Sequence, residues 1–194
     1  MTTRRRCVPA ALVLPALCAI TLWGCAGGRV VADHPAPAYT PGEVAYAASD
    51  RDLAVVLHGA PPGTDPATLG PAVTAAMQGR IMGVRTNFTT TPGESARPDY
   101  RVVMAFNPVE PLLSSALCAS GPVPTRAPAA AGGGLVVEAA FCRGGGALTA
   151  ARGTLESSAG PDDPEFRGLI GDITFALFPA YRDSDTNICV GANC

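Results

Sequence analysis

The fold is decided in the stretch YRVVMAF, residues Tyr100–Phe106. Every second residue in it is large and apolar, which is the period of a β-strand that buries one face. A second strand is predicted from the aliphatic run Leu53–His58, because Gly59 and a Pro-Pro-Gly turn follow it closely. A shorter β segment is expected over residues 86–91. The centre of the chain therefore predicts a sheet.

Two further strands are expected towards the C-terminus. They occupy Leu135–Cys142 and Ala147–Leu155 and flank three consecutive glycines, residues 144–146. Glycines at such a place are typical of a hairpin turn that needs positive φ angles. The two segments therefore predict an antiparallel hairpin.

Two amphipathic helices complete the pattern. The first follows the capping pair Asp65-Pro66, although Gly70-Pro71 is expected to delay its start, and Gly79 ends it. The second begins at Asp163-Pro164-Glu165, which combines an N-cap, a proline at the first helical position and an acid in the first turn. Their apolar faces consist of Leu69, Val73, Ala76 and Met77 in the first helix, and Phe166, Leu169, Ile170, Ile173 and Leu177 in the second.

The order of these elements, β-α-β-β-β-β-α, predicts an α+β fold. We expect a two-layer sandwich in which two helices cover one face of a mostly antiparallel sheet of four to five strands. The domain is expected over residues 51–182, and about 130 residues suffice for a hydrophobic core. The stretch Gly121–Gly134, rich in Pro, Ala and Gly, is expected to form a long mobile loop.

Four cysteines lie in or beyond this domain, at positions 118, 142, 189 and 194. In an oxidising compartment they are expected to be bridged, and three connectivities are possible. We favour Cys118–Cys142, which ties the long loop to the hairpin, and Cys189–Cys194, a local ring in a C-terminal tail over residues 183–194. A closed loop of about 25 residues is worth on the order of 3 kcal/mol.

The segment before the domain has a different character. Residues 25–50 contain scattered Gly, Pro and Ala and show neither helical nor strand periodicity, so they predict a flexible tether. Ahead of it lie the arginines at positions 4–6, an apolar run up to Trp23 and the small residue Gly24, which together are typical of a secretory signal.

The junction Leu22-Trp23-Gly24-Cys25 resembles the lipobox of bacterial membrane lipoproteins. The resemblance implies that residues 1–24 are removed and that the Cys25 thiol is acylated, palmitate being one of the usual chains. The apolar run is too short and too rich in proline for an uncleaved membrane span. Ala26, in place of an aspartate, implies sorting to the outer membrane, with the domain facing the periplasm.

The net charge of the chain limits the classes of partner that it is expected to bind. The chain has 14 basic residues, all arginine, against 16 acids, and three of the arginines precede Cys25. The processed chain therefore carries 11 arginines and a formal charge of −5, which argues against nucleic acid as a partner. The absence of lysine excludes a Walker A motif, a Schiff base and a Ser-Lys dyad.

No catalytic motif stands out, and we expect no catalytic residues, cofactor or metal. There is no Gly-x-Ser-x-Gly elbow and no His-Glu-x-x-His helix. Asp183–Asn187 opens like a calcium loop, but Ile188 and Cys194 stand where glycine and glutamate are needed. Of the two histidines, His34 lies in the expected tether, so histidine catalysis would fall on His58, where a structural role is favoured.

These observations predict a non-catalytic binding or accessory lipoprotein, with membrane and an envelope protein as partners. At the level of architecture, a tethered α+β domain is similar to envelope accessory lipoproteins such as peptidoglycan-synthase activators, which implies a binding role but transfers no residues. Two alternatives stay open, an envelope hydrolase that uses His58 and a small-ligand carrier with an apolar cavity.

Overall fold

The computed structural model describes residues 28–61, 63–126 and 132–180. The elements follow one another in the order β1 (Arg29–Ala32), α1 (Pro41–Ala48), β2 (Arg51–His58), α2 (Pro66–Met77), β3 (Thr86–Thr89), β4 (Tyr100–Phe106), α3 (Ser114–Cys118), β5 (Leu135–Arg143), β6 (Gly146–Leu155) and α4 (Pro164–Leu177). The predicted α+β class is confirmed, and all seven predicted elements are present in the predicted order.

The six described strands form one sheet in the order β1-β6-β5-β4-β2-β3. β4, β5, β6 and β1 pair antiparallel, whereas β2 runs parallel to both β3 and β4. The predicted hairpin is confirmed, with Arg143 opposite Gly146 and Gly144 at φ +56°. The expected count of four to five strands is wrong, because β1 was not predicted, and the sheet is mixed, with three antiparallel and two parallel pairings.

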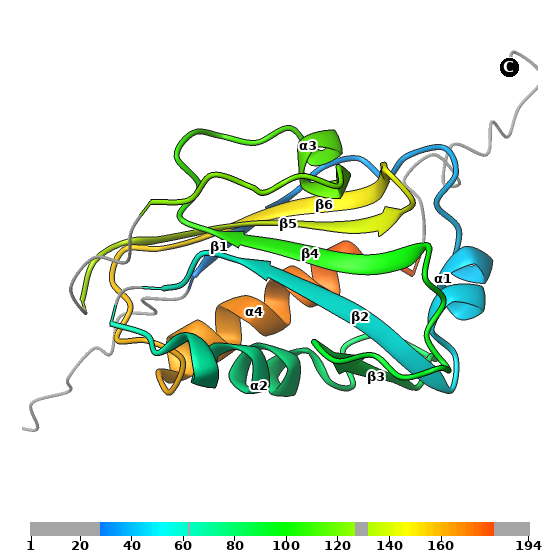
Figure 1. Cartoon of the computed structure of the whole chain (residues 1–194), viewed down its shortest axis with the longest axis horizontal. Coiled ribbons are helices and arrows are strands. Elements are labelled where there is room, and N and C mark those ends of the chain that lie inside the picture. Colours follow the sequence, from blue (N-terminus) through cyan, green and yellow to red (C-terminus); the bar gives the residue numbers. More distant parts are fainter. Residues whose placement is uncertain (1–27, 62, 127–131, 181–194) are drawn as a thin grey trace, which may run out of the picture.

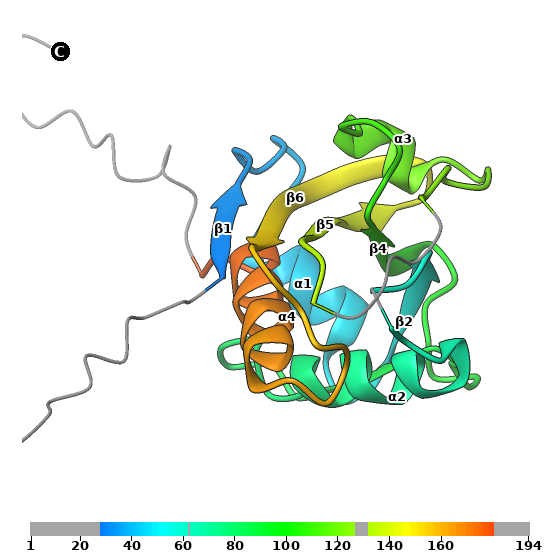
Figure 2. The ribbon, with the colours of Figure 1, turned by 90° about the vertical axis from the view of Figure 1, so that its left-hand side faces the viewer.

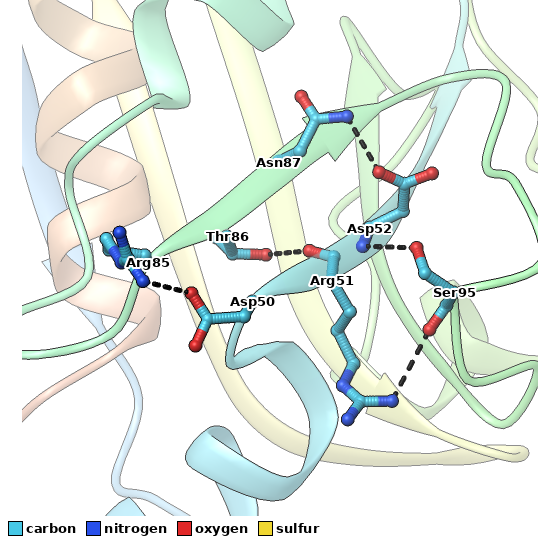
Figure 3. A pocket seen from close by; sticks show the side chains of 7 residues that line it. All are labelled: Asp50, Arg51, Asp52, Arg85, Thr86, Asn87 and Ser95. Atoms are coloured by element: carbon cyan, nitrogen blue, oxygen red, sulfur yellow. Dashed lines mark hydrogen bonds and ion pairs between the residues drawn. The ribbon is translucent and has the colours of Figure 1, made fainter.

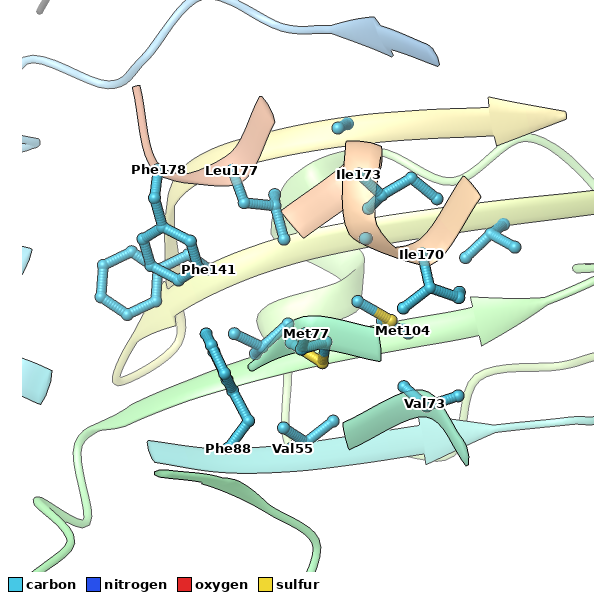
Figure 4. Close-up of a cluster of buried hydrophobic side chains, with 14 of the residues drawn as sticks. Val55, Val73, Met77, Phe88, Met104, Phe141, Ile170, Ile173, Leu177 and Phe178 are labelled. Carbon is cyan, nitrogen blue, oxygen red and sulfur yellow. The ribbon is translucent and has the colours of Figure 1, made fainter. Parts of the chain in front are cut away.

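The main hydrophobic core lies between the sheet and two helices. α2 and α4 cover one face, as Figure 1 shows, and their buried residues Val73, Met77 and Ile173 meet Met104 of β4 and Phe141 of β5 in the cluster of Figure 4. The short helix α3 covers the opposite face, over β4, β5 and β6, as Figure 2 shows from the side. Two helices therefore share one face as expected, but a smaller layer covers part of the other.

The predicted tether is wrong for residues 29–48, which belong to the domain. β1 adds an edge strand, with Arg29 opposite Thr154 of β6, and the chain continues along β6 to α1. There Val44, Ala47 and Ala48 are buried in the main core. The folded domain thus starts at about residue 28 rather than 51.

α1 closes the end of the core at which β2 begins. Thr40 caps it by accepting a hydrogen bond from the Glu43 backbone N–H at 3.0 Å, and Pro41 occupies its first turn. The Glu43 carboxylate accepts hydrogen bonds from the Tyr100 hydroxyl and from Arg143. These bonds lower the pKa of Glu43, the Tyr100 bond most strongly.

The expectation that Gly70-Pro71 delays the first helix is also wrong. α2 starts at Pro66, with the Asp65 side chain accepting from the Ala67 N–H at 2.9 Å, and Pro71 lies inside the helix. A proline there leaves one backbone carbonyl without its usual donor. The buried side chains Leu69, Val73 and Met77 hold the helix on the sheet in spite of that loss.

A disulfide joins Cys118, the last residue of α3, to Cys142 of β5, which is the pairing we favoured. It fastens the smaller layer to the sheet. The predicted Cys189–Cys194 pair, Asp183–Asn187 and Cys25 lie outside the described residues. So does part of the predicted long loop, residues 127–131, whose described flank is held by hydrogen bonds between Arg126 and Asn107 and between Gly132 and Ser158.

No helix in the described part of the chain is both long and apolar enough to cross a membrane.

Candidate functional site

A polar cleft lies at the end of the sheet where the parallel strands β2 and β3 begin. It has a volume of about 300 Å³ and is lined by Asp50, Arg51, Asp52, Arg85, Thr86, Asn87 and Ser95. Figure 3 shows these side chains coming from the two strand starts and from the loop that follows β3. The sequence did not predict this site, because its residues appear there as ordinary charged and polar residues beside a strand.

Asp52 is the most constrained carboxylate of the cleft. It accepts hydrogen bonds from the Asn87 amide at 2.7 Å and from the Gly93 N–H at 2.7 Å. These two donors lower its pKa, the amide being the larger cause. Its own N–H donates to the Ser95 hydroxyl. Asp52 is therefore an ionised anchor for the 93–95 loop and is unsuited to general acid catalysis near neutral pH.

The remaining charges of the cleft are only partly engaged. Arg85 pairs with Asp50 at 2.8 Å, but their side chains are 90% and 67% exposed. Such a pair is weak in water and exchanges readily for another partner. Arg51 donates to the backbone carbonyls of Ser49 and Ser95. With two arginines and two aspartates, the cleft offers balanced donors and acceptors, as suits a polar partner surface.

A second hollow, which we call the His58 groove, lies on the sheet face that carries α3. Its volume is about 330 Å³, and its lining consists of Val56, His58, Arg101, Val103, Leu117, Ala119, Ser120 and Gly121. The disulfide-anchored α3 forms one wall. The Arg101 guanidinium holds that wall by donating to the Cys118 carbonyl at 2.6 Å.

His58 ends β2 and is half-buried in this groove. Burial lowers the pKa of its imidazole, so the ring is neutral at pH 7. Among the described residues no hydrogen bond orients the ring. A general base needs a fixed orientation and a nearby nucleophile. The one hydroxyl that lines the groove belongs to Ser120, and within the described part of the chain no hydrogen bond joins it to His58.

Of the two cysteine pairs singled out by sequence, Cys118 and Cys142 belong to the described residues, and the structure brings them together. His34 is exposed and lies between β1 and α1, away from His58 in the chain. Within residues 28–61, 63–126 and 132–180, no three His, Cys, Asp or Glu side chains are grouped as a metal site would require.

No family model matches the chain, and no curated protein matches it. Among solved structures it is similar to PelC from Paraburkholderia phytofirmans, described as a dodecamer. That chain is 12% identical, and the match covers 78% of this chain and 97% of that one with a TM-score of 0.43. A substituted form of the same protein gives 12% identity, 78% and 98% coverage and a TM-score of 0.43. Likeness at this level shows neither shared function nor shared assembly.

Proposed function

We propose that the protein is a lipid-anchored cell-envelope protein that acts as a non-catalytic binding or accessory subunit. In this proposal, residues 1–24 are removed, Cys25 carries the lipid, and the domain faces the periplasm from the outer membrane. One observation supports the anchor most directly. The first described element, β1, begins at Arg29, so cleavage before Cys25 leaves every described element intact.

The polar cleft is the proposed contact surface for an envelope protein partner. Its Arg85–Asp50 pair is exposed and weakly held, so both side chains are available to a partner. Behind the pair, Asp52 is joined by hydrogen bonds to the side chains of Asn87 and Ser95. Hydrogen bonds already restrict these side chains, and the exposed charges in front of them select a partner of complementary charge.

Crosslinking in living cells tests this role. A C-terminally tagged full-length chain is crosslinked, and the proteins that co-purify from the membrane fraction are identified by mass spectrometry. We expect one dominant partner near stoichiometry. Arg85→Ala should lower its recovery several-fold, whereas Arg167→Ala, an equal charge change on α4, should leave it unchanged. Absence of an enriched partner, or equal recovery with both variants, would contradict the proposal.

The His58 groove supports a second candidate, a carrier or hydrolase that uses this hollow. Its apolar wall and neutral imidazole are the features in favour. His58→Gln keeps the size and polarity of the side chain but removes the base. Loss of an envelope hydrolase activity in this variant, with an unchanged melting temperature, would favour the second candidate over the first.

A further inference from the structure

Four of the other strands end or begin beside the start of β1. Arg29 lies opposite Thr154, so β1 begins where β6 ends. By the register of the sheet, β5 begins and β4 and β2 end at the same end of the sheet, with Leu135 opposite Leu155 and His58 opposite Ala105. We call this the proximal end. β2 and β3 begin at the opposite end, the distal end, which therefore holds the polar cleft.

The start of the described chain is fixed by packing. A Cβ on Gly28 would lie 2.7 Å from Leu169 Cδ1 and 3.0 Å from Leu155 Cδ2, so the backbone there is held against α4 and β6. Three Cα steps separate Gly28 from Cys25 and span at most about 11 Å. β6 has 10 residues, and a strand of that length extends over about 30 Å. The stretch from Cys25 to Gly28 is thus far shorter than the length of the sheet along its strands.

We propose that the domain stands end-on at the bilayer, with the proximal end against the lipid headgroups and the polar cleft presented to the periplasm. This inference rests on the proposed lipid at Cys25. Figure 1 shows the described chain starting at the proximal end and α4 ending at the distal end, near α1.

The charge of the proximal end sets how close the contact is. Exposed or half-exposed charges there include the acids Glu156, Asp162, Asp163 and Glu165 and the arginines Arg29 and Arg167. Carboxylates are repelled by the negative surface of anionic lipids. Charged side chains are costly to bury in the hydrocarbon region, so the proximal end rests on the headgroups without inserting between acyl chains, and the lipid supplies the binding energy.

Energy transfer measures the orientation. The single tryptophan of the chain, Trp23, precedes Cys25, so the processed protein has none and one added tryptophan is read without background. Glu156→Trp marks the proximal end, directly after β6, and Met82→Trp marks the distal end, where Met82 is 65% exposed. Each lipidated variant is purified from membranes and placed in phosphatidylcholine vesicles that contain dansyl-headgroup lipid.

We expect strong transfer from residue 156 and transfer near background from residue 82, at equal melting temperatures. Equal transfer from both sites, or stronger transfer from residue 82, in protein that floats with the vesicles would overturn the orientation and leave the anchor standing. Protein that does not float with vesicles would overturn the anchor and with it the orientation.

Discussion

Gly153 shows how closely α4 is seated on the sheet. A Cβ on this buried residue of β6 would lie 2.5 Å from Ile173 Cδ1 and 2.9 Å from Leu169 Cδ1. Gly153→Ala must therefore push the helix outward or force these side chains from their rotamers. We expect a loss of about 1–3 kcal/mol in the free energy of unfolding, measured by urea denaturation.

The matched control is Gly168→Ala on the exposed side of α4. A Cβ at Gly168 meets no atom within 4 Å, and alanine favours the helix over glycine by about 0.5–1 kcal/mol. This variant should be more stable than the natural chain. If Gly153→Ala were as stable as Gly168→Ala, the packing described between β6 and α4 would be wrong.

Glu43 links α1 to the sheet and makes stability depend on pH. Its folded-state pKa is lowered by hydrogen bonds from Tyr100 and Arg143. A carboxylate whose pKa is lowered in the folded state stabilises the fold at pH values above its unfolded-state pKa. This stability is lost as the pH falls through the folded-state pKa. Glu43→Gln should therefore cost on the order of 1 kcal/mol at pH 7. Below the folded-state pKa the difference should vanish. Denaturant unfolding of both proteins, at pH 7 and at a pH below the folded-state pKa of Glu43, checks this. A stability difference that persists at the acidic pH would contradict it.

At the scale of elements, the disulfide makes the clearest contribution to the stability of the fold. Cys118 and Cys142 are 24 residues apart, and removing a bridge of that span costs about 3 kcal/mol. The double variant Cys118→Ala/Cys142→Ala should lose about that much stability. Calorimetry with and without reductant provides the control, because reductant should lower the melting temperature of the natural chain much more than that of the variant.

The elements with strong local signals were predictable from sequence, and the others show why prediction failed. α4 was predicted because its cap, its first-turn acid and its apolar spacing agree. β1 was missed because it has only four residues and Val31 is 51% exposed, so no alternation shows. α1 was missed although Thr40, Pro41 and Glu43 form a capping signature. Its alanines look like those of a linker, but Ala47 and Ala48 are buried because α1 packs against the end of the main core.

The polar cleft could not be predicted for a different reason. Its residues come from positions 50–52, 85–87 and 95, and the parallel pairing of β2 with β3 brings the first two groups together. The sequence predicted both segments but not their direction or their adjacency. The Cys118–Cys142 bridge was easier, because the number of cysteines leaves few pairings.

At the scale of the whole molecule, the correction to the tether changes how the domain meets the membrane. A flexible segment of 25 residues would let the domain stand clear of the bilayer. With β1 starting at Arg29, the proposed anchor would lie next to the sheet, and in the proposed orientation the polar cleft would face away from the lipid. The lipid at Cys25 is therefore the central claim.

The intact mass of the protein extracted from membranes tests that claim most directly. We predict a chain of residues 25–194 with the added mass of a diacylglyceryl group and an amide-linked acyl chain. The variant Cys25→Ser should keep residues 1–24 and carry no lipid. A natural chain that retains its first 24 residues, begins at another position or lacks the lipid mass would contradict the account.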